Sequence, residues 1–440
     1  MKREPQAITS ALSVVLQDVT ATRRKSQWKS VPNVMAATLF AGAVAAGLSV
    51  ASARADVVTD WNVTANAVMT AESVGNNPRL RNLAMMHVAM SDAINTVQNR
   101  YTRVVATIPP MPGASAEAAA AAAARQILTE LYPAQKAKIE ETYMASLKAI
   151  PDGAAKSEGV ELGMQVATAV QAECAKDGTD APDTYRPHAA PGAYVPTQPP
   201  LFEQYARAKP WVLKNVDQFR PGPPPPLTSA AWARDYNEVK SVGGTKSTAR
   251  TPEQTEAVKF WGNANFGGAW QAAARELSAK KELGLAESAR LLALLNMGLA
   301  NAYMINWDAK YTYNFWRPVT AIRNGDQDGN DATERDAGWT SLNPTPLHPE
   351  YPSQATLNAT IATAVLESAF GPVKAIPFTA TDVRDPKRTR QFASLADMAE
   401  EHKNVRIWGG VHYTFAIRTS EGVGQKLAAY MIENTLQPAR

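Results

Sequence analysis

The chain has 440 residues, 45% of them hydrophobic and 20% charged, so it is long enough to bury one large domain or two ordinary ones. Ten tryptophans and mixed charges exclude a disordered chain, and a single cysteine, Cys174, excludes an intramolecular disulfide framework and a thiolate metal cluster. The formal net charge is +4, but residues 1–55 hold seven basic and two acidic residues, which leaves −1 for the remainder. Global charge therefore gives no support for nucleic-acid binding.

Residues 1–55 are typical of a secretory leader. Basic residues between Arg23 and Lys29 precede an apolar run, Val34–Val50, and Ala53-Arg54-Ala55 follows as a small-residue cleavage site. A membrane anchor is less favoured, because the run is rich in Ala and Gly and only near the ~18–20 residues needed to span a bilayer. We expect this leader to be removed and the protein to be exported, to the periplasm or outside the cell, without a stable membrane span.

Apolar residues recur every three or four positions along much of the remaining chain, which predicts an all-α fold. The predicted helices are Val63–Gln98, Ser115–Leu131, Pro133–Ala149, Ala154–Ala175, Ser229–Val242, Pro252–Phe266, Ala269–Leu283, Ala286–Trp307, Thr356–Phe370, Phe392–Lys403 and Arg418–Leu436. Strand-like alternation is scarce. On the first of these helices, His87 and Asp92 are expected to be structural, with His87 held in the core by a neighbouring polar group.

Two helical halves, residues 56–188 and 229–440, are expected to form one compact unit. Residues 189–228 form a Pro-rich connecting segment, with four consecutive prolines at Pro223–Pro226. Aromatic residues are interleaved with these prolines, which favours a segment that wraps the body over a solvated linker. Farther along, Asp326–Asp331 indicates a solvated turn rather than a calcium loop, because its glycine is fourth rather than sixth and no Glu closes the loop.

Two cations seven residues apart, Lys310 and Arg317, belong to the stretch KYTYNFWRP. On a helix, seven residues turn through about 700°, within ~20° of two full turns, so the pair is predicted to share one helix face. In the stretch YPSQ, Ser353 precedes the predicted helix Thr356–Phe370. The free N–H groups and the positive dipole end of a helix start favour an anion there.

A third stretch, RIWGGVH, holds Arg406 and His412 with Gly409 and Gly410 between them. Glycine allows the backbone to approach a small ligand closely. Three cations, one hydroxyl at a helix start and one imidazole are the groups that a small tetrahedral oxyanion requires. Phosphate and vanadate are the natural candidates.

These stretches resemble the signature K-x6-R-P, P-S-G-H and S-R-x5-H that vanadium-dependent haloperoxidases share with type 2 phosphatidic acid phosphatases. The likeness continues through Trp61–Asn62, His87–Asn95, Phe219–Ser229 and Arg250–Thr255, and it is to the soluble, secreted, haloperoxidase-like branch. It implies helical bundles around a buried oxyanion pocket, and vanadate as cofactor or phosphate as an alternative ligand. The implied substrates are hydrogen peroxide with a halide, or a phosphate ester.

The resemblance also implies a role for each motif residue. The imidazole of His412 would be the axial ligand of vanadium, or the nucleophile on phosphorus. The positions that would bind the oxyanion are Lys310, Arg317, Ser353, Gln354, Arg406 and Gly410. The three cations among them would neutralise its oxygens, and the others would add hydrogen bonds.

Two positions depart from the family pattern: Val405 stands where Ser is usual, and Ala355 stands where the acid–base His is expected. General acid–base catalysis supplies ~10²–10⁴-fold in rate, so weakened turnover is expected. His348, seven residues before Ala355, is a candidate substitute, against the alternative that it braces the turn. A haloperoxidase, an acid phosphatase, a non-catalytic oxyanion-binding protein and a helical scaffold without ligand therefore all stay open. The oligomeric state stays open too, a homo-oligomer included.

Overall fold

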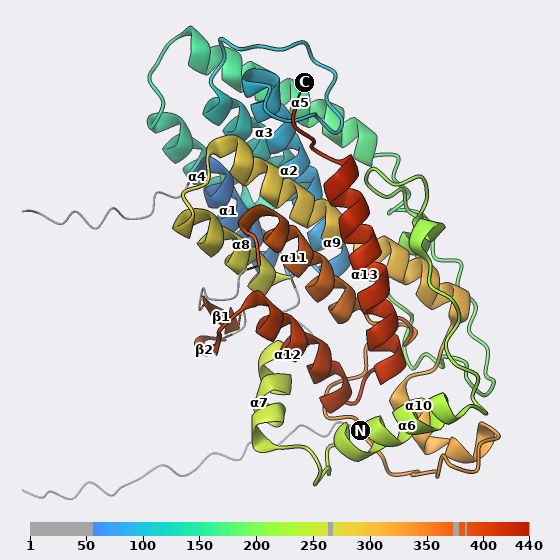
Figure 1. The fold of residues 1–440 in the computed structure, drawn as a ribbon. Coiled ribbons are helices and arrows are strands. Elements are labelled where there is room, and N and C mark those ends of the chain that lie inside the picture. The colour runs from blue at the N-terminus through green and yellow to red at the C-terminus, as the bar shows by residue number, and fades with distance from the viewer. Residues whose placement is uncertain (1–55, 263–266, 373–377, 383–384, 440) are drawn as a thin grey trace, which may run out of the picture. The chain divides into compact units, whose positions relative to one another are not determined.

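The computed structural model describes residues 56–439 except 263–266, 373–377 and 383–384. The predicted leader and the end of the predicted helix Pro252–Phe266 lie outside the described residues. The described part folds into helices α1 to α13 and one two-stranded hairpin (Figure 1), which confirms the predicted all-α fold. None of these described helices is long and apolar enough to cross a membrane.

Helices carry most of the regular structure in the described residues. They are α1 (Val57–Ala71), α2 (Asn76–Gln98), α3 (Ala116–Leu131), α4 (Lys136–Lys148), α5 (Ala154–Cys174), α6 (Ala230–Val242), α7 (Pro252–Trp261), α8 (Gly268–Lys280), α9 (Leu285–Tyr313), α10 (Pro318–Arg323), α11 (Gln354–Phe370), α12 (Leu395–Trp408) and α13 (Thr414–Asn434). The hairpin pairs β1 (Phe378–Asp382) with β2 (Asp385–Phe392) in antiparallel register.

Local sequence explains where helices begin. Thr251 caps α7: its hydroxyl accepts from Gln254 N at 3.1 Å, and Gln254 Oε1 accepts from Thr251 N at 2.9 Å. The single helix predicted over Val63–Gln98 is wrong. The chain leaves helical geometry after α1, passes through Ser73 at φ +52°, and starts α2 behind Gly75, whose backbone is extended.

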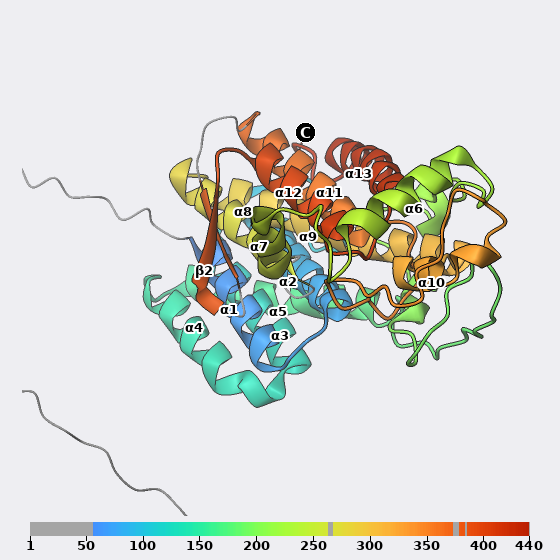
Figure 2. The same cartoon turned by 90° about the horizontal axis from the view of Figure 1, so that it is seen from below.

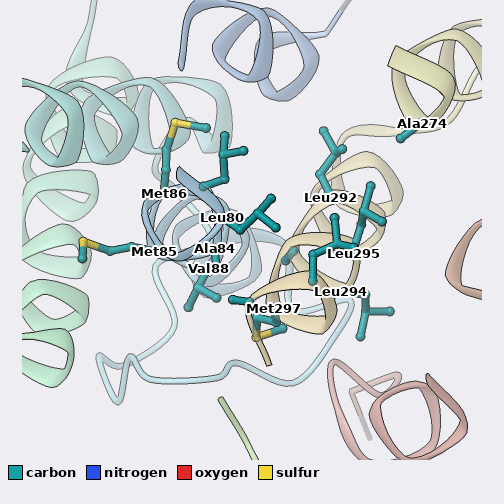
Figure 3. Packing of buried hydrophobic residues seen from close by; sticks show 14 of the residues in the cluster. Leu80, Ala84, Met85, Met86, Val88, Ala274, Leu292, Leu294, Leu295 and Met297 are labelled. Carbon is teal, nitrogen blue, oxygen red and sulfur yellow. The ribbon is translucent and has the colours of Figure 1, made fainter. Parts of the chain in front are cut away.

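Two long helices, α2 and α9, form the centre of the core. Every residue from Leu291 to Lys310 is buried, as expected for a helix that is covered on all sides. Figure 3 shows buried side chains of the two helices directed toward one another, among them Val88 of α2 and Met297 of α9. Helices α11 and α13 also pack on α9, with α12 beside α11 (Figure 1 and Figure 2). The first motif thus begins at the end of the most deeply buried helix.

The Pro-rich segment packs against the helical body, as predicted. Tyr194 N donates to Asn314 O at 2.7 Å, just after α9, and Leu201 N donates to Leu347 O at 3.1 Å, just before α11. Since these two loops carry the first and second motifs, the Pro-rich segment forms part of the surroundings of the site.

Several polar residues that the sequence singled out are structural. His87 is fully buried, with Nε2 2.8 Å from Asn62 Nδ2, and Asp92 accepts three backbone N–H groups that follow α2, each at 2.8 Å. The turn after α10 is not wholly solvated as expected: Asp328 is buried and accepts from Trp232 Nε1 at 2.8 Å. No cluster of three or more metal-ligating side chains occurs among the described residues.

Candidate functional site

The helix that carries Lys310 ends before Arg317, so the predicted shared helix face is wrong. Asn314 terminates α9 in the left-handed conformation, at φ +46° and ψ +41°, which asparagine tolerates better than most residues. Arg317 then stands at the start of α10 with an extended backbone. Both side chains nevertheless contact the loop that precedes α11, so they meet through the tertiary fold.

Lys310 anchors that loop. Its Nζ donates to the carbonyl oxygens of Pro349, Glu350 and Pro352, at 2.8, 2.7 and 2.6 Å. Burial, together with the charge of Arg317, lowers the pKa of Lys310 well below its ordinary value. Three carbonyl acceptors nevertheless require three N–H donors, which only the charged ammonium has. We therefore assign Lys310 as a buried cation whose hydrogens are all committed to the loop.

Arg317 joins the second and third motifs. Its Nε donates to His348 O at 2.9 Å, and its Nη1 donates to Val411 O at 2.8 Å. Nη2 lies 2.9 Å from His348 Nδ1, and Nη1 lies 3.4 Å from His412 Nε2. Burial lowers the pKa of Arg317 to about 10, so the guanidinium keeps its charge at neutral pH. Arg317 is therefore a buried cation that contacts the imidazoles of both His348 and His412.

A buried carboxylate, Glu350, orients His412. Glu350 Oε1 lies 2.6 Å from His412 Nδ1 and accepts from Tyr413 N at 3.2 Å. Burial raises the pKa of Glu350 to about 7 and, with Arg317 and the other cations, lowers the pKa of His412 well below its ordinary value. Since Oε1 accepts from a backbone N–H, we assign the imidazole as neutral with its proton on Nδ1. Nε2 then keeps a lone pair beside Arg317.

Sequence reasoning did not find Glu350. The signal that could have found it is an acid inside HPEYPS, three residues before Ser353, in a segment otherwise free of charged residues. A histidine that binds a metal or attacks phosphorus commonly has its second nitrogen held by such a carboxylate. Only the fold shows that it pairs with a residue 62 positions away.

The second motif opens α11 as expected, with Ser353 at the N-cap. Ser353 N donates to Ser420 Oγ at 2.8 Å, and the Ser353 hydroxyl accepts from Thr356 Oγ1 at 3.0 Å. Gln354 Nε2 donates to Asn358 Oδ1 at 2.7 Å, while Gln354 Oε1 is buried without a hydrogen-bond partner among the described residues. The helix start thus has one carbonyl oxygen that a ligand donor could satisfy.

The third motif places Arg406 near the end of α12, where its side chain is 2% exposed. Burial and the neighbouring Arg317 lower the pKa of Arg406 to about 9, so it stays charged at neutral pH. Gly410 has φ +74°, and a Cβ there would lie 2.4 Å from Gly243 O. Its glycine is required by this backbone contact, and Gly410 does not line the cavity described next.

One cavity of about 360 Å³ collects residues from the second and third motifs. The motif-associated residues that line it are His348, Gln354, Ala355, Arg406 and His412. Lys310, Arg317 and Ser353 do not line it, although Arg317 contacts both histidines that do. The predicted residues therefore lie in one region as two groups. One group lines the cavity, and the other holds the lining loops in place through hydrogen bonds.

The charge of this region is unbalanced. Lys310, Arg317 and Arg406 are 0, 1 and 2% exposed, and Glu350 is the buried carboxylate that acts on Lys310 and Arg317. Removing three cations from water is costly, and a nearby negative charge reduces that cost, so the region favours an anionic guest. A tetrahedral oxyanion fits these residues, because the His412 lone pair and the Arg406 guanidinium are at the cavity. Ala355 offers no proton donor, which is where the fit is incomplete.

Three comparisons with known proteins agree with the motifs. A model of the VCPO second helical-bundle domain matches residues 290–439, which include all three motifs. The vanadium chloroperoxidase of Curvularia inaequalis is 28% identical over 176 residues, which cover 34% of this chain but only 29% of that protein.

The fold is shared with solved bacterial enzymes. The first bacterial vanadium-dependent iodoperoxidase has a TM-score of 0.74 at 23% identity, covering 87% of this chain and 97% of its own. A holo-type bacterial vanadium-dependent chloroperoxidase has a TM-score of 0.67 at 18% identity. The match covers 80% of this chain and 90% of the chloroperoxidase chain. The chain thus shares the helical fold of these solved haloperoxidases, and its residues 290–439 resemble the second helical-bundle domain of VCPO.

Proposed function

We propose that the chain is a haloperoxidase-like protein that binds vanadate, or phosphate in its place, at the end of the cavity formed by Arg406 and His412. The observation that supports this most directly is the gathering of three almost fully buried cations, Lys310, Arg317 and Arg406, around the cavity that His412 lines. An oxyanion would offset their charge, and the likeness to vanadium-dependent haloperoxidases provides the reason to name vanadate.

Each residue has a distinct part in this proposal. His412 binds the central atom of the anion through Nε2, because Glu350 holds its Nδ1 proton. Arg406 neutralises the anion's oxygens at the cavity, Arg317 adds positive charge from beside His412, and Lys310 keeps the loop before α11 in place. When bound, vanadate supplies the activation of hydrogen peroxide that halide oxidation requires. Electrostatic stabilisation by fixed cations costs no reorganisation during the reaction.

His348 is proposed to handle the proton that the missing histidine would handle. It lines the same cavity as Ala355, and its ring lies 4.7 Å from the ring of Trp307. Arg317 is a permanent donor, so His348 Nδ1 accepts from it and the proton of the neutral ring is on Nε2. Burial, with the charges of Arg317 and Lys310, lowers the pKa of His348 well below its ordinary value. The neutral ring is a weak acid, so we expect turnover to be weaker than with the missing histidine.

A non-catalytic oxyanion-binding protein is the second candidate, and Ala355 is the observation that favours it. An acid phosphatase of the same superfamily would need a proton for the leaving group, so without that histidine it would act best on esters with good leaving groups.

Titration calorimetry with orthovanadate and with inorganic phosphate tests anion binding. The wild type is expected to bind both, and His412→Ala and Arg406→Met are expected to weaken binding at least tenfold, or about 1.4 kcal/mol. Arg418→Met, which removes an exposed arginine from α13, is the matched control and should bind as the wild type does. A folded wild type that takes up neither anion would refute the proposal.

Bromide oxidation by the vanadate-loaded protein in hydrogen peroxide separates the two candidates. Turnover that falls in His348→Ala supports the enzyme, whereas tight binding without turnover supports the non-catalytic protein. Ala355→His should then raise turnover, since it restores an imidazole to the cavity wall. Equal rates before and after that change would mean that another group already transfers the proton.

Export through the leader is part of the proposal, supported by the sequence pattern alone. The mature protein, isolated after expression in its host, should begin just after Ala55. An intact N-terminus in a cytoplasmic fraction would contradict this.

A further inference from the structure

We infer that the same cavity also binds an aromatic organic molecule, with its ring against a wall formed by Phe202, Tyr303 and Trp307 and next to the oxyanion. This inference rests on the proposed function, because it takes the Arg406 and His412 end of the cavity as the anion site. It names the class of substrate that the remaining space accepts.

The cavity is larger than its anion requires. Its volume is about 360 Å³, whereas a water molecule takes ~30 Å³ of liquid volume and a four-oxygen anion only a few times that. Pockets for small organic molecules have volumes of roughly 300–1,000 Å³ and are mostly apolar with a few polar groups. Peroxide and a halide ion would leave most of this space unfilled.

One wall of the cavity is aromatic and held in place. The rings of Tyr303 and Trp307 lie 5.2 Å apart at 34°, and Trp307 Nε1 donates to Leu201 O at 3.0 Å, which fixes the indole. Phe202 comes from the Pro-rich segment and lies edge-on to Tyr205 at 5.9 Å. Gly75 leaves room for it, since a Cβ there would stand 3.2 Å from the tip of the Phe202 ring.

An aromatic guest gains most from such a wall, because rings favour offset or edge-on neighbours in addition to apolar burial. Small polar reactants gain nothing from it. Leu201 also lines the cavity and is 45% exposed, so the cavity reaches the surface beside the aromatic wall. An organic molecule could therefore enter at the apolar side and place its polar end toward the cations.

Two buried amide atoms in the cavity lining lack hydrogen-bond partners in the described part of the chain. They are Asn77 Nδ2 and Gln354 Oε1, on residues that are 3 and 7% exposed. Buried polar atoms are normally paired, so an unpaired donor and an unpaired acceptor in one cavity point to a guest that carries both kinds of group. An aromatic ring with a hydroxyl substituent meets this need, because a hydroxyl both accepts and donates.

Calorimetry with two phosphonates tests the inference without any reaction, since their carbon–phosphorus bond resists hydrolysis. Phenylphosphonate and methylphosphonate present the same charged group, but only the first has a ring. Phenylphosphonate is expected to bind the wild type at least tenfold more tightly, which corresponds to about 1.4 kcal/mol. Phenol titrated in the presence of saturating phosphate shows whether the ring is accepted as a separate molecule or only when it is joined to the anion.

Variants in the Pro-rich segment locate the ring. Phe202→Ala should remove at least two-thirds of the phenyl advantage and leave methylphosphonate binding unchanged. Phe219→Ala is the matched control, because Phe219 lies in the same segment but packs on Tyr430, at 5.7 Å, and does not line the cavity. A phenyl advantage that survives Phe202→Ala would overturn the assigned wall.

The failures of the two proposals are distinguishable. If inorganic phosphate binds but the two phosphonates bind equally, the aromatic site is refuted and the oxyanion site stands. If phosphate does not bind at all, the proposed function itself fails. Phenol that competes with phosphate instead of binding beside it would also refute an aromatic site next to the anion.

Discussion

Replacing Glu350 with Gln should tighten anion binding above neutral pH and leave it unchanged below. Glutamine keeps the shape of the side chain, and its amide oxygen can still accept from His412 Nδ1 and from Tyr413 N, which lie 2.6 and 3.2 Å from the carboxylate oxygen. The substitution therefore removes a charge while it preserves the tautomer of His412. What changes is the repulsion between Glu350 and a bound anion.

The size of that repulsion follows from the geometry. An anion bound to His412 Nε2 is separated from the Glu350 carboxylate by the Glu350–His412 contact, the width of the imidazole ring and one ligand bond. Together these lengths amount to about 7 Å, so at an effective dielectric constant of ~20 the repulsion is about 2 kcal/mol per unit charge. That energy corresponds to roughly 30-fold in affinity.

The pH dependence has a definite sign. Burial raises the pKa of Glu350 to about 7 in the free protein, and an anion raises it further. Binding to the wild type is therefore strongest below pH 7, where Glu350 is already protonated, and weakens as pH rises through 7. Glu350→Gln should match the wild type at pH 6 and bind roughly 30-fold more tightly at pH 8.5, because the wild type must then protonate Glu350, about 1.5 pH units above its pKa, in order to bind.

Sulfate is the probe for this measurement, because it stays a tetrahedral dianion over the whole range. Its Kd is measured by calorimetry for both proteins at half-unit steps from pH 6 to 8.5. Any loss of charge from Lys310 or Arg406 near the upper limit affects both proteins alike, so the ratio of the two Kd values isolates Glu350. A ratio that stays constant with pH, or weaker binding by Glu350→Gln at every pH, would refute this reasoning.

Three further substitutions or treatments test the structural assignments. Gly410→Ala should lower the free energy of unfolding by about 1–3 kcal/mol in urea denaturation, because φ is +74° and Cβ would meet Gly243 O. Gly422→Ala is the control, since a Cβ there has open space around it and should not destabilise the protein. Equal losses in the two variants would contradict this account. Lys310→Met leaves three buried carbonyl oxygens without their donor, so it should lower the free energy of unfolding by about 3 kcal/mol or more in the same assay. A decrease of less than about 1 kcal/mol would argue against the anchoring role. The Cys174 thiol is 4% exposed and burial raises its pKa to about 12, so iodoacetamide should label it only after unfolding, as followed by mass spectrometry, and rapid labelling of the native protein would be inconsistent with its burial.

The helical content could be predicted because helix periodicity and capping are properties of neighbouring residues. Thr251, Pro252 and Gln254 act within one turn, and together they cap the start of α7. The same kind of reasoning failed for Lys310 and Arg317, since their spacing suggested a shared helix face. The left-handed Asn314 ends the helix between them, and a rule based on periodicity does not detect such a residue.

For this protein, the amino-acid sequence alone determined the all-α class, the three motif segments and the absence of a histidine at Ala355. It could do so because each of these depends on residue type and short spacing. The tertiary structure alone decided that Glu350 pairs with His412, that the hydrogens of Lys310 are committed to a loop, and that Phe202 of the Pro-rich segment faces the motif cavity. Those contacts join segments distant along the chain, and they form only when burial of the helices around α9 brings the loops together.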